Sequence, residues 1–157
     1  MKALVTGATG FIGSHLAEEL AKREIGVRCL IRPTSNLQWL SGLDAEFIKG
    51  DCCEKDSLYG AVEGVDVVFH LAGILRTKES REYFRVNYNG TQCLLQACRE
   101  ANPSLKKFIF ISSQAAAGPS PDGHPVKESS PPHPLSEYGW SKLLAEKEVL
   151  MEKNNLP

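Results

Sequence analysis

Short apolar runs rich in β-branched residues alternate with amphipathic helical patterns five times along the 157 residues. The runs that predict strands are residues 2–6, 27–31, 45–49, 66–71 and 107–112. The patterns that predict helices are residues 11–23, 37–40, 56–62, 81–101 and 136–153. Such alternation favours a parallel sheet with helices on both faces, because parallel neighbours need helical crossovers. We therefore expect a doubly wound α/β fold in one domain spanning residues 1–157.

The stretch VTGATGFIG joins the first predicted strand to the first predicted helix. Gly7, Gly10 and Gly13 stand three residues apart, where the chain must turn sharply, approach a ligand closely and pack a helix on a strand. The helix N-terminus then offers free N–H groups to an anion such as a pyrophosphate. In this strand–turn–helix context the glycines predict a Rossmann-type nucleotide site, although a glycine-rich turn without ligand is the plain alternative.

The end of the second predicted strand indicates which dinucleotide is bound. Arg32 stands there instead of an acidic residue, and a guanidinium suits a 2′-phosphate, which favours NADP over NAD. A solvent-facing arginine is the alternative interpretation. Asp51 follows the third strand, where its carboxylate either accepts from the adenine amino group or simply forms a turn.

Tyr138 and Lys142 lie four residues apart at the start of the last predicted helix, after the proline-rich loop 119–134. This spacing puts the phenol and the ammonium on one helix face. Taken alone, the pair reads as a first-turn tyrosine and a solvated lysine. A loop of that length is more often functional than idle.

Charge and cysteine content exclude several classes of protein. The net charge is −1 without a basic stripe, so neither nucleic acid nor an anionic membrane is expected as a partner. No apolar run is long enough for a membrane helix, and a cytoplasmic location is expected. The five cysteines lack CxxC spacing, and the four histidines are scattered, so we expect reduced thiols and no metal site.

Six segments in order resemble the extended short-chain dehydrogenase/reductase family, the NAD(P)-dependent epimerase/dehydratase group. They are TGATGFIG, GD at 50–51, HLAG at 70–73, VNYNGT at 86–91, ISS at 111–113 and YGWSK at 138–142. The resemblance implies that Tyr138 is the acid/base and that Lys142 acts beside it, since a neighbouring ammonium favours phenolate. Ser113 matches the family's catalytic serine, with Ser112 as the alternative.

The resemblance also implies a cofactor site that runs across the sheet. Leu71, Ala72 and Gly73 would lie along the cofactor, or simply pack at a strand end. Asn87 sits near the active site, where structural hydrogen bonding is equally expected. The predicted cofactor-binding residues are Gly7, Thr9, Gly10, Phe11, Ile12, Gly13, Arg32, Asp51, Cys52, Leu71, Ala72, Gly73, Asn87, Tyr138 and Lys142.

The implied activity is hydride transfer between a nicotinamide and a substrate carbinol carbon. A nucleotide-sugar epimerase or dehydratase is expected first. The alternatives are a ketone reductase resembling dihydroflavonol reductases or hydroxysteroid dehydrogenases, a non-catalytic dinucleotide-binding regulatory module, and a structural subunit. QAAAG lacks the tyrosine that many sugar epimerases carry before the glycine, which weakens the first assignment.

Family members continue beyond the tyrosine–lysine helix into further strands and a smaller substrate-binding region. We therefore expect that this chain lacks the C-terminal substrate region and that a sixth strand would follow directly after NNLP. By analogy with relatives, a homodimer through the helices near 81–101 and 136–153 is expected.

Overall fold

The computed structural model describes residues 1–120 and 123–156. Its five strands are β1 (Lys2–Thr6), β2 (Gly26–Ile31), β3 (Glu46–Lys49), β4 (Val67–His70) and β5 (Lys107–Phe110). Its helices are α1 (Phe11–Lys22), η1 (Gln38–Leu40), η2 (Lys55–Ser57), α2 (Tyr59–Val62), α3 (Arg81–Tyr83), η3 (Phe84–Asn89), α4 (Gly90–Ala101), α5 (Gln114–Ala117), α6 (Glu137–Met151) and η4 (Glu152–Asn154).

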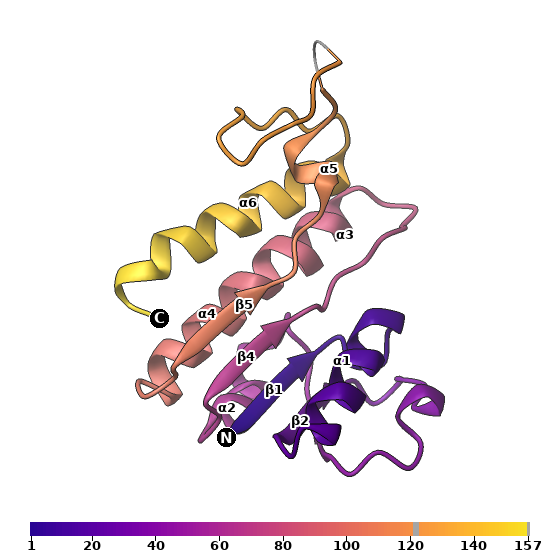
Figure 1. Ribbon diagram of the computed structural model, residues 1–157, viewed down its shortest axis with the longest axis vertical. Coiled ribbons are helices and arrows are strands. Elements are labelled where there is room, and N and C mark those ends of the chain that lie inside the picture. Colours follow the sequence, from indigo (N-terminus) through magenta and orange to yellow (C-terminus); the bar gives the residue numbers. More distant parts are fainter. Residues whose placement is uncertain (121–122, 157) are drawn as a thin grey trace.

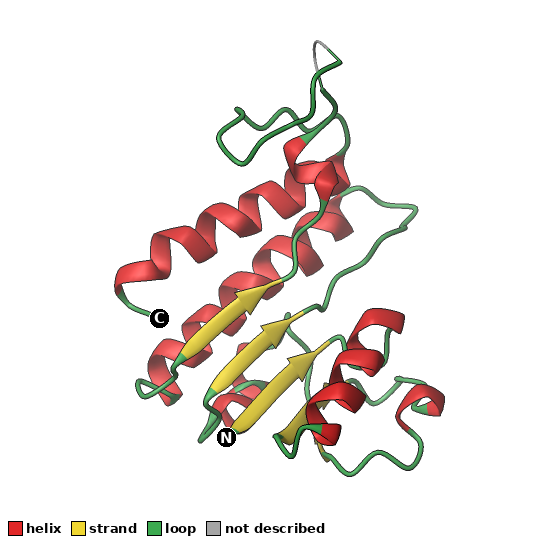
Figure 2. Ribbon diagram, in the orientation of Figure 1, coloured by secondary structure: helices red, strands yellow, loops and turns green. Residues whose placement is uncertain are grey.

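The strands form one parallel sheet in the order β3-β2-β1-β4-β5. All the arrows point the same way in Figure 2. The chain winds outward from β1 to β3, then returns to the centre and winds outward again to β5. The crossovers that leave β1 and β4 therefore run in opposite directions. In α/β sheets, ligands bind at the carboxyl ends of the two strands where the direction changes, which are β1 and β4 here.

Each face of the sheet has its own apolar core. One cluster includes Leu4, Val68 and Leu94 and lies under α2 and α4. The other includes Val5, Ala17 and Leu20 and lies under α1. Figure 1 shows α4 and α6 together on one side of the strands and α1 on the other. The predicted doubly wound Rossmann-type sheet is confirmed.

Two local features differ from the sequence prediction. The single helix expected over 81–101 is interrupted by η3, a six-residue π-helical segment. The fifth strand ends at Phe110 and not at residue 112, and the short helix α5 follows it. The predicted loop 119–134 contains residues 121 and 122, which lie outside the described residues. Its described part holds no helix or strand.

Among the described residues, no helix is long and apolar enough to cross a membrane. The same residues contain no group of three metal-ligating side chains. The five cysteines are free, and three of them are buried.

Candidate active site

The glycine turn between β1 and α1 is shaped by close backbone contacts. Gly7 has φ +71°, and a Cβ there would lie 2.7 Å from the backbone nitrogen of Ala72. A Cβ on Gly13 would lie 2.2 Å from the carbonyl oxygen of Gly7. The turn is closed by a 3.0 Å hydrogen bond from the Gly10 nitrogen to the Gly7 oxygen. Side chains at Gly7 and Gly13 would therefore push apart the turn, α1 and the segment after β4.

A cavity of about 600 Å³ lies at the carboxyl ends of the strands, beside this turn. Nearly all the predicted site residues line it: Gly7, Thr9, Gly10, Phe11, Ile12, Gly13, Arg32, Asp51, Cys52, Leu71, Ala72, Gly73, Tyr138 and Lys142. Ser113 and Asn87 do not. The sequence interpretation named Ser112 only as the alternative to Ser113, and it did not assign to the site the lining residues Leu30, Ser35, Gly50, Ile74, Leu75, Val86 and Ile111. Gly50, Val86 and Ile111 lie within the family motifs quoted above, and most of the others adjoin predicted residues or strand ends.

Arg32, Ser35 and Asp51 lie at the end of the cavity formed by β2 and β3. The Arg32 backbone nitrogen donates to the Ser35 hydroxyl over 3.0 Å, and the Arg32 side chain is exposed. The Asp51 carboxylate accepts from the Cys53 nitrogen over 2.9 Å, which gives it the turn role considered above. Burial raises the pKa of the neighbouring Cys52 thiol to about 12, so this cysteine is an inert wall of the cavity.

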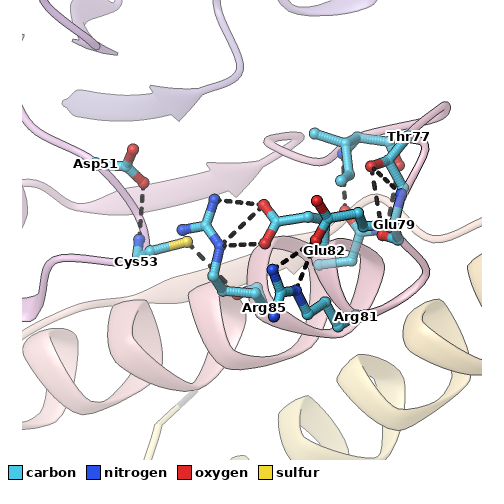
Figure 3. A network of polar contacts seen from close by, with 9 residues as sticks. Asp51, Cys53, Thr77, Glu79, Arg81, Glu82 and Arg85 are labelled. Atoms are coloured by element: carbon cyan, nitrogen blue, oxygen red, sulfur yellow. Dashed lines mark hydrogen bonds and ion pairs between the residues drawn. The ribbon is translucent and has the colours of Figure 1, made fainter.

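Figure 3 shows how this loop is tied to the helical segment that contains Glu82 and Arg85. The Cys53 thiol donates to the Arg85 carbonyl oxygen over 3.4 Å. The Arg85 guanidinium in turn donates to both carboxylate oxygens of Glu82. The loop after β3 therefore contacts η3, the segment from which Val86 lines the cavity.

Tyr138 and Lys142 lie at the opposite end of the cavity, in the first turns of α6. The Ser136 hydroxyl caps this helix by accepting from the Gly139 nitrogen. Both side chains line the cavity, as their four-residue spacing predicts for one helix face. Tyr138 also packs its ring edgewise against Tyr83 of α3, with ring centroids 5.9 Å apart.

Lys142 is a cation in a nearly dry environment, with only 5% of its surface exposed. Its ammonium donates to the Ile111 carbonyl oxygen over 2.7 Å and lies 4.0 Å from the centre of the Phe110 ring. Burial lowers the pKa of Lys142 to about 8. The side chain is therefore close to exchanging its proton at neutral pH, as acid–base chemistry requires.

The two serines after β5 have different surroundings. The Ser113 hydroxyl caps α5 by accepting from the Ala115 nitrogen over 3.2 Å. The Ser112 hydroxyl oxygen is buried and has no hydrogen-bond partner among the described residues, although Ser112 lines the cavity. The catalytic role assigned to Ser113 stays a prediction, and an unsatisfied hydroxyl next to the cavity belongs to Ser112.

Asn87 lies behind the cavity and is fully buried. Its side-chain oxygen accepts from the Ile74 nitrogen, and its amide group donates to the Ile74 oxygen and to the Ser141 hydroxyl. Ser141 itself donates to the Tyr138 carbonyl oxygen. Asn87 thus ties the segment after β4 to the helix of Tyr138, which is the structural alternative considered for it. Direct cofactor contact by this side chain stays a prediction.

Gly139 is a further residue that the sequence did not single out. A Cβ there would lie 2.3 Å from the Ala115 carbonyl oxygen, so this glycine lets α6 approach α5 closely. The helix of Tyr138 and the segment of Ser113 consequently meet side by side, as Figure 1 shows.

Comparison with known proteins shows the family to which the chain is related. The family model described as "NAD dependent epimerase/dehydratase family" matches residues 3–155. An uncharacterised UDP-glucose epimerase, YtcB of Bacillus subtilis, is 42% identical over 94% of this chain and 50% of its own length. The human "sterol-4-alpha-carboxylate 3-dehydrogenase, decarboxylating" is 32% identical over 95% of this chain and 39% of its own.

Solved structures agree with the sequence relatives. The UDP-glucuronic acid 4-epimerase from Bacillus cereus in complex with NAD superposes with a TM-score of 0.81 at 37% identity. That match covers 100% of this chain and 54% of the epimerase. The chain therefore spans about half the length of the relatives it matches.

Proposed function

Because the chain belongs to the NAD-dependent epimerase/dehydratase family, we propose that it forms the dinucleotide-binding and proton-transferring half of a nucleotide-sugar epimerase or dehydratase. The observation that carries this proposal is the position of Tyr138 and Lys142 on the same cavity as the glycine turn. A nucleotide base binder without chemistry would not need a phenol and a buried ammonium at the far end.

The residues present fit a nicotinamide dinucleotide. Gly7 and Gly13 leave a backbone cradle that a Cβ would fill. The free N–H groups at the start of α1 face the same cavity and suit a pyrophosphate. The buried Ser112 hydroxyl lacks a partner in the described structure, and a polar group of a ligand would satisfy it. When bound, such a cofactor supplies a carbon that accepts a hydride from the substrate and can return it.

The side chains of this protein would then handle the proton. Tyr138 takes the proton from the substrate hydroxyl, or returns it, at its phenol oxygen. The Lys142 ammonium stabilises negative charge on that oxygen. A serine hydroxyl after β5 holds the substrate oxygen as charge develops, and Ser113 is our first assignment for this role.

We further propose a preference for NADP over NAD, based on Arg32. Its guanidinium is exposed at the adenosine end of the cavity and can pair with a 2′-phosphate. Arg32→Asp should weaken binding of NADPH more than binding of NADH, measured by titrating the coenzyme fluorescence. Equal effects on the two coenzymes would remove this preference. The solved relative contains NAD, so NADH is the reference ligand in the same titration.

Coenzyme titration also tests the proposed function. Wild-type chain should bind NADH or NADPH, Gly13→Val should abolish binding, and Tyr138→Phe should bind unchanged because the ring is retained. Absence of binding by the wild-type chain would contradict both the enzyme and the regulatory module.

Turnover then separates the remaining functions. A protein in which this chain is joined to a substrate-binding region should convert UDP-glucose or UDP-glucuronic acid, and Tyr138→Phe should stop conversion. A ketone reductase acting on sterol-like substrates is the second candidate, and the human sterol dehydrogenase relative favours it. Coenzyme binding without turnover of either substrate class would support the regulatory module.

We also propose a cytoplasmic homodimer, in which α4 and α6 of two copies pack together. The exposed apolar side chains Trp140, Leu150 and Met151 of α6 support this arrangement. Sedimentation equilibrium should give twice the chain mass, and Trp140→Lys should reduce it to the chain mass.

A further inference from the structure

A chain of polar groups crosses the apolar interior directly below the cavity. It joins Thr6 at the end of β1, His70 at the end of β4 and Thr91 in α4, all with 0% of their surface exposed. The Thr6 hydroxyl lies 2.7 Å from Nδ1 of His70, and Nε2 of His70 lies 3.0 Å from the Thr91 hydroxyl. This polar chain is connected to the backbone at both ends. Thr6 accepts from the Ala72 nitrogen, and Thr91 donates to the Asn87 carbonyl oxygen.

The far end of this chain fixes the direction of every hydrogen bond. The Thr91 hydroxyl donates its one proton to the Asn87 carbonyl oxygen over 2.7 Å, since a carbonyl can only accept. Towards His70 it must therefore accept, which places the imidazole proton on Nε2.

Burial keeps the imidazole of His70 neutral. It lowers the pKa of His70 to about 3, and the Lys142 cation nearby acts in the same direction. A neutral ring with its proton on Nε2 leaves Nδ1 as an acceptor, so Thr6 donates to it. The Thr6 oxygen is then free to accept from the Ala72 nitrogen over 3.2 Å.

The near end of the chain acts on the walls of the cavity. Thr6 directly precedes Gly7, and the Leu71–Ala72 backbone is the group that a Gly7 Cβ would strike. Pairing the Ala72 N–H with the Thr6 hydroxyl holds the two segments at this separation. Both Gly7 and Ala72 line the cavity.

We propose that His70, as the Nε2–H tautomer, is a positioning residue for the dinucleotide: through Thr6 it sets the spacing between the glycine turn and the segment after β4. The proposal rests on the dinucleotide-binding function argued above. It assigns no chemical step to His70, which does not line the cavity.

The tautomer can be measured without any ligand. In the ¹⁵N-labelled wild-type chain, long-range ¹H–¹⁵N correlation should show a protonated Nε2 and an unprotonated Nδ1 for His70 at neutral pH. His70→Asn assigns the resonance by its disappearance. In Thr91→Val the group that fixes the proton on Nε2 is gone, so the Nδ1–H form should become populated. A predominant Nδ1–H tautomer in the wild-type chain would overturn the proposal.

Two substitutions separate the two ends of the polar chain. An asparagine oxygen stands two bonds from Cβ, as Nδ1 does, so His70→Asn keeps the acceptor for Thr6 and loses the bond to Thr91. A glutamine nitrogen stands three bonds from Cβ, as Nε2 does, so His70→Gln keeps the donor to Thr91 and loses the bond to Thr6. These are matched variants that each bury one amide.

Coenzyme titration with the two variants tests the positioning role. The dissociation constant for NADH should rise by about tenfold or more in His70→Gln and change little in His70→Asn, since a lost buried hydrogen bond corresponds to about this factor. Equal weakening in both variants would overturn the positioning role and leave a purely structural one. If wild-type chain bound no coenzyme, the proposed function would fail, whereas the tautomer measurement would still decide the arrangement of protons.

Discussion

Lys142 shows how a single residue can serve chemistry at the expense of stability. Its ammonium is almost fully buried and is compensated by one carbonyl oxygen and the face of the Phe110 ring. A desolvated cation paired in this way costs stability, which the lowered pKa expresses. The ring of Phe110 offsets part of that cost.

We therefore predict that Lys142→Met stabilises the fold at pH 7. The lowered pKa of Lys142 corresponds to a cost of about 3 kcal/mol on folding, which is the largest gain in unfolding free energy that the substitution can give. The variant also loses the hydrogen bond to Ile111, so we expect a gain of about 1–2 kcal/mol. Unfolding in urea at pH 7 measures this difference.

The pH dependence of that difference provides the control. The unfolded chain keeps the Lys142 proton up to its ordinary pKa of 10.5, whereas the folded chain releases it near pH 8. Wild-type stability relative to Lys142→Met should therefore rise between pH 8 and pH 10.5. A variant that is less stable at pH 7, or a difference independent of pH, would show that the ammonium is well compensated.

At the residue scale, motif spacing predicted that Tyr138 and Lys142 lie together at the cavity, but it did not predict the contacts of the serines and of Asn87. Tyr138 and Lys142 share a helix face for a geometric reason that four-residue spacing alone provides. Ser112 and Ser113 could not be separated in this way, because β5 ends at Phe110 and strand alternation no longer determines which hydroxyl faces the cavity. The polar partners of Asn87 come from distant segments, so no local pattern shows them.

At the scale of elements, α2 depends on side chains from outside it. It has four residues, too few to form a stable helix alone. The Arg28 guanidinium of β2 donates to the carbonyl oxygens of Gly60, Ala61 and Glu63, and Asn102 donates to those of Val62 and Val65. Carbonyl groups that would otherwise be buried without partners are satisfied by two residues.

Arg28→Met should destabilise the protein by about 2–4 kcal/mol, because it leaves several buried carbonyl groups unpaired. Arg23→Met is the matched control. Arg23 forms an exposed pair with Glu19 one helical turn away, and its loss should cost less than about 0.5 kcal/mol. Equal urea midpoints for the two variants would show that the Arg28 contacts contribute little.

The approach of α5 to α6 also depends on one position. Gly139→Ala places a methyl group against the Ala115 carbonyl oxygen, so α6 must shift, and we expect a loss of about 1–3 kcal/mol. Gly60→Ala is the control, since nothing lies within 4 Å of its Cβ position. That change should be neutral or slightly stabilising, because alanine favours a helix. If Gly139→Ala unfolded at the same urea concentration as Gly60→Ala, the close contact would be easily relieved.

The interruption of the helix over 81–101 could not be predicted from periodicity. A single π-helical turn leaves the apolar residues before and after it facing the core, so the sequence pattern still predicts one continuous helix. At this segment the Asn87 side chain bonds the Ile74 backbone, which follows β4. Such contacts depend on the position of β4, which only the assembled sheet provides.

At the scale of the whole molecule, alternating strands and helices were sufficient to predict the sheet and the side on which the cavity opens. Right-handed crossovers leave few possible topologies, and the structure shows the order β3-β2-β1-β4-β5. The cavity, however, is completed by segments from both halves of the chain, including η3 and the end of β5. Their placement depends on packing, so the motifs that contain Val86 and Ile111 did not show that these residues line the cavity.

The pH dependence of the stability of the whole protein is the sum of the contributions of its titratable groups. His70 titrates at 6.5 when unfolded and at about 3 when folded, so its contribution is complete above pH 6.5 and is lost as the pH falls towards 3. Paired carboxyls such as Glu46 and Asp66 lose their contribution only below about their ordinary pKa values of 4.5 and 3.8. The first acid loss, between pH 6.5 and 4.5, should therefore come from His70.

At alkaline pH, buried thiols lower the free energy of unfolding. Burial raises the pKa of the Cys29 and Cys53 thiols to about 11 and of the Cys52 and Cys98 thiols to about 12, from 9.0 when unfolded. Since these thiols lose their proton first in the unfolded chain, stability should fall above pH 9, and four of them outweigh the gain from Lys142.

We thus predict a plateau of the free energy of unfolding between about pH 6.5 and pH 8, a rise due to Lys142 between pH 8 and pH 9, and a decline above pH 9, measured by urea unfolding with a reductant present. His70→Asn removes the group that must stay neutral, so its stability should be flat between pH 6.5 and 4.5 while the alkaline decline persists. A wild-type profile that is flat down to pH 4.5 would mean that the imidazole of His70 is charged or solvated in the folded state. That result would contradict both the burial of His70 and the proton arrangement proposed for the polar chain beneath the cavity.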